Sequence, residues 1–448
     1  MKSKVWKIFA ALAVFAMLVA SCAPAVTAEP TSAPAVAPTT ASVATEAPAN
    51  TDKTKITMWS HSAGNPTEIA VVEKAIEQFN AESEKYEIVL EAFPQASYND
   101  SVAAASVAGS LPDIIDMDGP TVPNFAWAEY IQPLPLTDAD LKTMGILSAD
   151  VGTYNGKIYS LGQFDVALLI YGRKSILEKY NIRIPTIDNP WTKDEFMAAL
   201  DTLKASGEFE YPFDPNPGYT GEWWPYAYSP LLQSFGGDLI DRSSYTTAEG
   251  KLNGSEALAW GEWFQGLFKN GYANPTPADD QGFLQGKVAL WYTGSWSADA
   301  VVKQYGDDAL FLPAVDFGDG PKIGAGSWQW GISATSPNAE GAWEFIKYLM
   351  EPEQVAAMSE ATGLIPTTPA AAALTTKYKE GGLYRVFYDM ALAYAVVRPP
   401  TPGYLVISSA FEQAGSAIRD GGDVQNALDD AVDKIDQDIQ DHNNYGFE

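Results

Sequence analysis

The sequence is poor in histidine and cysteine. It contains two histidines, His61 and His442, and a single cysteine, Cys22, among 448 residues. One cysteine cannot form a disulfide within its own chain. Zinc and related metals are usually held by several Cys or His side chains, so a metal site of that type is excluded. We therefore expect no metal and no cofactor.

Positive charge and catalytic signatures are also scarce. Lys and Arg total 28 against 57 Asp and Glu, which gives a net charge of −29. Such a chain repels nucleic acid and anionic lipid headgroups, so we expect no nucleic-acid partner. The aspartates at 113, 116 and 118 do not have the spacing of a calcium loop, and we find neither a phosphate-binding P-loop nor a Gly-x-Ser-x-Gly elbow. We assign no catalytic residue and expect a protein that is not an enzyme.

The N-terminal segment has the build of a secretory signal peptide. Lys2, Lys4 and Lys7 precede an apolar stretch over residues 8–20. That stretch is shorter than the roughly 20 residues a membrane-spanning helix needs, although an uncleaved anchor is the alternative. The stretch ends in Leu18-Val19-Ala20-Ser21-Cys22, which resembles a bacterial lipobox.

In that family of signals, cleavage falls before the cysteine, whose sulfur then carries diacylglycerol. The resemblance implies a signal peptide over 1–21 and a lipid on Cys22, and two acyl chains are enough for stable anchoring. Residues 22–52 are mostly Ala, Pro, Thr, Ser and Val, so we expect a disordered tether. The body would then work at the outer face of the cytoplasmic membrane.

From residue 53 onward, strand-like and helix-like patterns alternate, as in an α/β sheet covered by helices. A chain of this length exceeds one compact core, so two lobes are expected. Predicted strands cover residues 55–59, 86–92, 112–115, 158–171 and 288–292. Predicted helices begin at 65, 97, 192, 255, 336 and 424, and two of them end at 108 and 269.

Several short landmarks together resemble the extracellular solute-binding proteins of importers driven by ATP-binding cassettes, in particular the sugar-binding cluster akin to maltose-binding protein. Their order and spacing carry the resemblance. They are ITMWSH (56–61), LPDIID (111–116), YIQPL (130–134), GKIYSL (156–161), GKVAL (286–290), GSW (294–296), WGIS (330–333), WEFIKYL (343–349) and TGLIPT (362–367).

This resemblance implies a two-lobe fold of the type II periplasmic-binding class, with each lobe a sheet flanked by helices and a hinge of several strands. The chain would cross between lobes near 163–166, 311–314 and 365–369. One lobe would hold 53–164 and 313–366, and the other 165–312 and 367–448. The implied function is capture of a mono- or oligosaccharide and its delivery to membrane permease subunits. We expect a monomer.

Residues that could bind a sugar lie at strand ends and in loops. Carboxylates and amides pair with hydroxyls, and aromatic rings cover sugar faces. Strand ends supply Ser60, His61, Asp116 and Asp118, because ligands of such sheets lie beyond the carboxyl ends of strands. The resemblance adds Asp165, Trp296 and Tyr404. A Gly/Pro-rich segment, which we predict to be a loop over 216–230, and two other segments supply Trp223, Trp224, Tyr228, Trp328 and Arg398.

Each of these candidates has a structural alternative. Asp116 and Asp118 could cap the next turn, and Trp223 with its neighbours could plug the space between lobes. Arg398 could form a structural salt bridge, which we slightly favour. Two other functions also stay open. The same fold could bind a polyamine through its negative charge and aromatic rings, and the many acidic residues are compatible with a glycoside hydrolase, which needs two facing carboxylates.

Overall fold

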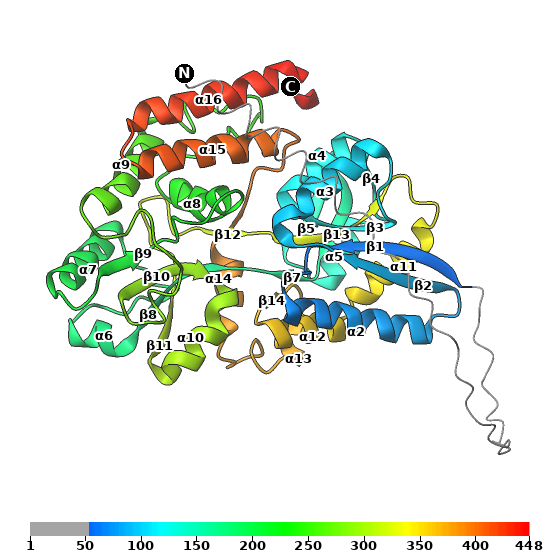
Figure 1. Cartoon of the computed structure of the whole chain (residues 1–448), viewed down its shortest axis with the longest axis horizontal. Coiled ribbons are helices and arrows are strands. Elements are labelled where there is room, and N and C mark those ends of the chain that lie inside the picture. Colours follow the sequence, from blue (N-terminus) through cyan, green and yellow to red (C-terminus); the bar gives the residue numbers. More distant parts are fainter. Residues whose placement is uncertain (1–52, 448) are drawn as a thin grey trace, which may run out of the picture. The chain divides into compact units, whose positions relative to one another are not determined.

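The computed structural model describes residues 53–447. The predicted signal peptide, the predicted lipid site at Cys22 and the predicted tether lie outside these residues. Between 53 and 447, no helix combines the length and apolar character needed to cross a membrane. The described chain contains two main sheets with helices on their faces (Figure 1), as the α/β prediction requires.

The larger sheet takes a strand from late in the chain into its centre. The parallel strands β1 and β3 lie side by side, and β13 pairs antiparallel with β3 on one edge and with β6 on the other. The strand order is β2 (Tyr86–Ala92), β1 (Thr54–Ser60), β3 (Ile114–Asp118), β13 (Trp328–Ser333), β6 (Lys157–Gly162) and β5 (Val151–Tyr154), with β4 (Ile131–Gln132) against β13.

Helices bury both faces of this sheet. On one face, Phe79 of α2 and Phe345 of α11 meet with ring centroids 5.0 Å apart. On the other, Ile115 and Met117 of β3 pack against Val122 of α4. The helices of this part are α2 (Pro66–Glu82), α3 (Gln95–Ala108), α4 (Val122–Trp127), α5 (Asp138–Met144), α11 (Ala339–Leu349) and α12 (Pro352–Thr362).

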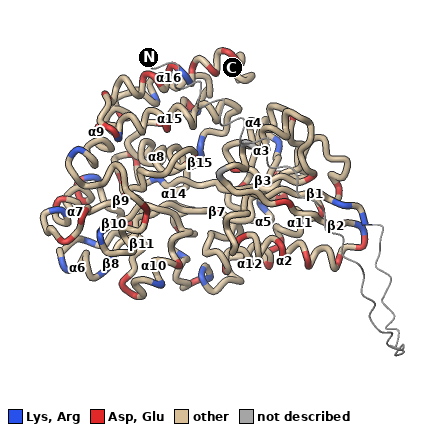
Figure 2. The backbone as a smooth tube through the Cα atoms, viewed as in Figure 1, with Lys and Arg blue, Asp and Glu red and all other residues tan. Residues whose placement is uncertain are grey.

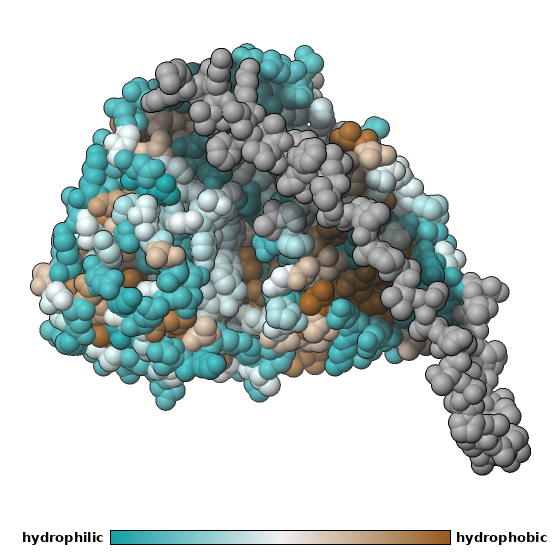
Figure 3. Space-filling model, viewed as in Figure 1, coloured by the Kyte–Doolittle hydropathy of each residue, from teal (hydrophilic) through white to brown (hydrophobic). Residues whose placement is uncertain are grey.

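The smaller sheet has the order β11 (Ala309–Leu312), β8 (Leu168–Arg173), β10 (Val288–Gly294) and β9 (Tyr211–Asp214). Every residue of β10 is buried, so helices cover both faces. The helices of this part are α6 (Lys174–Lys179), α7 (Lys193–Ala205), α8 (Trp223–Ser234), α9 (Ser255–Lys269), α10 (Ala298–Tyr305), α14 (Arg385–Tyr394), α15 (Tyr404–Arg419) and α16 (Val424–Asp441). The short helix α13 (Pro369–Leu374) packs against α12 of the other part. Charged residues lie along outer helices such as α6 and α7 (Figure 2), where the visible surface is largely hydrophilic (Figure 3).

Two short ladders lie between the sheets. β7 (Phe164–Asp165) pairs antiparallel with β14 (Ile365–Pro366), and β12 (Ile323–Ala325) pairs parallel with β15 (Ala395–Val397). The single strand predicted over 158–171 is therefore wrong. The chain leaves the larger sheet after β6, crosses in β7 and enters the smaller sheet as β8.

The division into two lobes remains our proposal, with one crossing moved. Residues 311–312 belong to β11, and the next segment stays with the smaller sheet. There the Asp316 amide donates to the Trp191 carbonyl and the Asp319 amide to the Ser234 carbonyl. We therefore draw this crossing at β12. Below, the large-sheet lobe means the larger sheet with its helices, and the small-sheet lobe means the smaller sheet with its helices.

Gly324 of β12 tests how tightly this crossing is packed. A Cβ added at Gly324 would lie 2.3 Å from the carbonyl oxygen of Tyr226, so the backbone would have to move. We expect Gly324→Ala to lower the free energy of unfolding by about 1–3 kcal/mol, seen as a lower Tm. In the control Gly266→Ala, on α9, the nearest atom would be 3.6 Å away, and Tm should stay constant or rise. Equal Tm values for the two variants would contradict the close approach.

Candidate functional site

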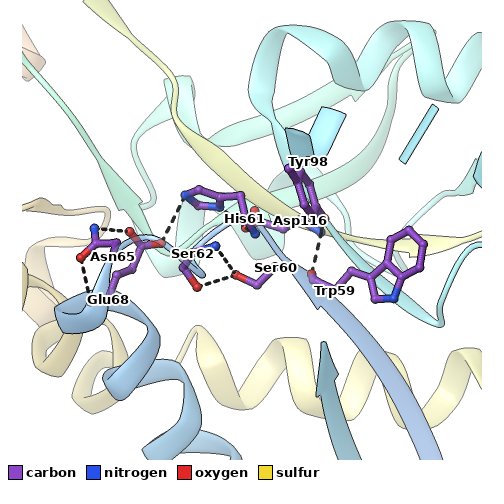
Figure 4. A network of polar contacts seen from close by, with 8 residues as sticks. All are labelled: Trp59, Ser60, His61, Ser62, Asn65, Glu68, Tyr98 and Asp116. Atoms are coloured by element: carbon purple, nitrogen blue, oxygen red, sulfur yellow. Dashed lines mark hydrogen bonds and ion pairs between the residues drawn. The ribbon is translucent and has the colours of Figure 1, made fainter. Parts of the chain in front are cut away.

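His61 lies at the centre of a buried polar cluster where β1 ends. Its Nδ1 makes a short contact with Asp116 of β3, and its Nε2 lies 3.4 Å from Glu68 of α2 (Figure 4). The imidazole stacks on Trp328 of β13, with ring centroids 3.7 Å apart and planes 8° apart. His61 is only 5% exposed. The predicted candidates His61, Asp116 and Trp328 are therefore in direct contact.

Local capping positions this cluster. The Asn65 side chain caps α2 by accepting from the Glu68 amide at 3.3 Å, and its Nδ2 donates to Glu68 Oε2 at 3.0 Å. These bonds hold the Glu68 carboxylate, and its other oxygen is the one that faces His61. Ser60 is buried, with its hydroxyl 2.9 Å from the hydroxyl of Ser62.

Arg398 lies at the centre of a second buried cluster. Its guanidinium donates twice to Asp118 of β3, at 2.9 and 3.0 Å, and once to Glu222 just before α8, at 2.5 Å. It also donates to the Gly326 carbonyl at 2.7 Å. The salt-bridge alternative for Arg398 is thus what the structure shows. Asp118 lies in the large-sheet lobe and Glu222 in the small-sheet lobe, so one side chain joins the two.

Glu222 extends this cluster to α15. It accepts hydrogen bonds from the hydroxyl of Tyr404 and, at 2.9 Å, from that of Ser408. Burial raises the pKa of Glu222; Arg398 opposes that shift and the nearby Asp118 adds to it. Tyr404 is fully buried, so its ring is enclosed by protein in this conformation.

The two clusters and a group of aromatic rings are continuous. Trp328 and Asp118 are register partners between β13 and β3. The Arg398 guanidinium lies 5.2 Å from the ring centroid of Tyr226, whose ring is 6.4 Å from that of Trp296. The predicted candidates at the ends of β1, β3 and β13, together with Arg398 and with Trp296 just after β10, therefore form one connected set that spans both lobes.

Trp296 differs from its neighbours because it is partly open to solvent. It is 39% exposed, although its ring packs edge-on against the buried Trp223 at 6.3 Å. Gly294 lies directly beneath it, and an added Cβ there would be 1.9 Å from the ring. An exposed ring held by buried rings is a surface on which a flat ligand face can stack.

Asp165 of β7 is fully buried in the hinge. One oxygen accepts from the amides of Val166 and Gly326, at 2.8 and 3.0 Å, and the other has no partner. Burial raises the pKa of Asp165 to about 7, against the opposing effects of those two amides and of Arg398. Asp165 also lines a cavity of about 530 Å³ that extends along α14.

The loop predicted over 216–230 is present over 216–222, but the prediction is wrong from Trp223 on, where α8 begins and all residues are buried. Twelve residues without a charge suit a helix that is apolar on every side. Trp224 and Tyr228 face the core beside Phe264, with their polar atoms bonded to the Tyr219 and Pro215 carbonyls. They stay apart from the cluster around Arg398, whereas Trp223 supports Trp296.

Sequence reasoning missed Glu222, Glu68 and Tyr226. Glu222 is the only charged residue between Asp214 and Asp238, which is a usable signal for a functional acid. Glu68 lies in the first turn of a predicted helix, where an acidic residue is expected to cap the helix, so it carries no separate signal of function. Within residues 53–447, no group of three or more His, Cys, Asp or Glu side chains is arranged to hold a metal ion.

Comparison with known proteins identifies one family that this chain matches. Residues 74–384 match the model of the bacterial extracellular solute-binding proteins. An uncharacterized lipoprotein of Streptomyces antibioticus is 24% identical over 81% of this chain and 76% of its own length. A probable ABC transporter-binding protein of Deinococcus radiodurans is 25% identical over 58% of this chain and 64% of its own.

Solved structures share the fold. A cyclic alpha-maltosyl-1,6-maltose binding protein of Arthrobacter globiformis superposes with a TM-score of 0.72 at 22% identity, covering 87% of this chain and all of that one. The GacH receptor of Streptomyces glaucescens, solved free and with acarbose, superposes with a TM-score of 0.69 at 21% identity. The match covers 86% of this chain and 97% of the receptor. At these identities the similarity establishes the two-lobe binding-protein fold.

Gly294→Ala tests the position of Trp296. The backbone at Gly294 is extended, so alanine is compatible with it and only the indole ring must move. We expect the fold and Tm to be nearly unchanged while ligand affinity drops about tenfold or more, the loss of one stacking contact. Gly266→Ala is the matched control. Unchanged affinity in Gly294→Ala would show that this position of Trp296 is not used.

Asp165→Asn tests the charge state of the hinge. A carboxyl with a raised pKa favours the folded state most at low pH, and that stability is lost as pH rises from about 4 to about 7. Asparagine keeps the acceptor for both amides without a charge. We expect the variant to match the parent Tm near pH 4 and to exceed it at pH 8. A constant Tm difference between pH 4 and pH 8 would contradict the raised pKa.

Proposed function

This chain belongs to the bacterial extracellular solute-binding proteins, and on that premise we propose that it captures a carbohydrate between its two lobes and delivers it to the permease of an ATP-binding-cassette importer. Bound sugar would bridge the lobes and favour their closure, since a ligand shifts a conformational equilibrium toward the state it binds better. The closed form would then present its surface to the membrane permease.

The observation that carries the proposal is the partly exposed Trp296 next to the interlobe cluster. Its ring is 39% exposed and held by Trp223 and Tyr226, with Arg398, Asp118 and Glu222 close by. A sugar needs an apolar surface for its ring face and charged or polar groups for its hydroxyls. This arrangement supplies both within one connected set.

The acids of the site are arranged for binding. Asp118 and Glu222 share Arg398, and Asp116 and Glu68 share His61. A glycoside hydrolase needs one carboxylic acid poised to donate a proton and a second carboxylate poised to act as nucleophile or base. Each of these four carboxylates already has a cationic partner. Asp165, which forms no ion pair, is fully buried and bonded to two backbone amides. This arrangement favours a receptor without catalysis. The same partners reduce the free negative charge that a polyamine would require.

We also propose that Cys22 carries the lipid anchor, with residues 1–21 removed and 22–52 acting as the tether. One relative is itself named a lipoprotein, and another a probable ABC transporter-binding protein, which supports this placement. The cyclic alpha-maltosyl-1,6-maltose binding protein and the GacH receptor solved with acarbose, which share the fold, support a carbohydrate as the cargo. The receptor would act as a monomer at the outer face of the membrane.

A thermal-shift panel of mono- and oligosaccharides and polyamines tests the ligand class. At a hundredfold excess over Kd, a true ligand stabilises the folded state by about 2.7 kcal/mol, so at least one neutral sugar should raise Tm clearly and polyamines should not. Trp296→Ala should lose the shift. Trp127→Ala is the matched control, because Trp127 is also 39% exposed but packs against His442 and Tyr445.

Three results would overturn the proposal in different ways. A shift with polyamines alone would make the ligand a cation, and turnover of chromogenic glycosides would make the chain an enzyme. If no sugar in a wide panel raised Tm or reduced the radius of gyration in small-angle scattering, the carbohydrate assignment would fail.

A further inference from the structure

His61 has no polar atom left to offer a ligand. Nδ1 contacts Asp116 and Nε2 faces Glu68 (Figure 4). One face of the imidazole ring also lies flat on Trp328. The side chain is also buried. A sugar could reach His61 only after these contacts were broken, so a direct ligand contact, as predicted from the sequence, does not follow from this geometry.

The surroundings of His61 favour its charged form. A neutral imidazole donates from one nitrogen only and would turn a lone pair toward the second carboxylate, whereas the imidazolium donates to both. The facing groups are Asp116 and Asp118 of β3, Glu68 of α2 and Tyr98 of α3. Burial on its own lowers the pKa of His61, but Asp116 above all, with Glu68 and Asp118, outweighs burial and raises the pKa.

The same contacts immobilise Trp328. His61 covers one face of the indole at 3.7 Å, and Tyr98 meets it nearly at right angles at 5.6 Å. Trp328 is half-buried, so part of the residue stays open to solvent. Its strand partner is Asp118, which accepts hydrogen bonds from Arg398. Trp328 is thus an aromatic surface of the large-sheet lobe, as Trp296 is of the small-sheet lobe.

We propose that protonated His61, held between Asp116 and Glu68, is a positioning residue that fixes Trp328 in the orientation in which a ligand stacks on it, without itself touching the ligand. The proposal deepens the sugar-receptor function and rests on it. It assigns ligand recognition in the large-sheet lobe to a ring whose orientation depends on a proton on its neighbour.

A pH dependence follows from this arrangement. The contribution of the imidazolium is complete below the ordinary pKa of histidine, about 6.5, and is lost as pH rises through the raised pKa of His61. The imidazole then keeps one carboxylate partner, and Trp328 is held less firmly. At low pH the cluster also weakens, because burial raises the pKa of Glu68, which then protonates earlier than an ordinary glutamate. Affinity should be greatest between these two transitions.

The effect of protonated His61 on Trp328 can be tested without a ligand. The sequence holds only His61 and His442, so His442→Gln leaves one histidine signal for a titration by nuclear magnetic resonance. His442 is a suitable background because it lies at the end of α16 beside Asp438. We expect His61 to titrate above the ordinary value, and lower in Asp116→Asn. Trp328 emission, taken as the difference from Trp328→Phe, should change through the same transition.

Binding is tested with the sugar that gives the largest shift in the panel. The affinity of the parent protein should fall about threefold to tenfold as pH rises through the measured pKa of His61, because one unit of pKa change on binding is worth tenfold. His61→Gln keeps one donor but does not titrate. It should bind more weakly at the optimum and show no such transition.

The outcomes separate this proposal from the receptor function. Sugar binding that stays constant through the titration of His61, or Trp328 emission that does not follow it, would overturn the positioning role and leave the receptor intact. An affinity transition that survives in His61→Gln would overturn it too. If no sugar binds at any pH, the receptor function fails, and the positioning role fails with it.

Discussion

One buried guanidinium connects the parts of this protein that make its candidate site. Arg398 binds Asp118 from the large-sheet lobe and Glu222 from the small-sheet lobe, and it also donates to the Gly326 carbonyl in the hinge. Burying such charges costs several kcal/mol per ion, and only good geometry with further hydrogen bonds offsets that cost. Because Tyr404 and Ser408 satisfy Glu222, the site exists only when these distant segments lie together.

The order of the strands explains how distant residues meet. The chain builds most of the larger sheet first, leaves it through β7, and later returns through β12 to insert β13 between β3 and β6. That return sets Trp328 opposite Asp118 and over His61. Two rings then serve the two lobes, each supported by buried neighbours: Trp328 by His61 and Tyr98, and Trp296 by Trp223 and Tyr226.

Local signals were enough for much of the fold. The strand over 86–92 and the helix over 255–269 have the predicted bounds, because a short apolar run and helical spacing are properties of short segments. The helix α8 and the role of Glu222 were missed. A run without alternating polar and apolar residues has no period that reveals a helix. Glu222 and Arg398 are 176 residues apart in the sequence, and tertiary packing that no local pattern encodes brings them together.

The central claim is that Arg398 holds the two lobes together across the site. The distance between the lobes can be measured by pulsed electron paramagnetic resonance. Spin labels are attached at Val107→Cys on α3 and Glu262→Cys on α9, two exposed positions, in a Cys22→Ser background. Asp118→Asn removes the carboxylate that ties Arg398 to the large-sheet lobe. The account predicts a longer and broader distance distribution in this variant than in the parent. Superimposable distributions would contradict it.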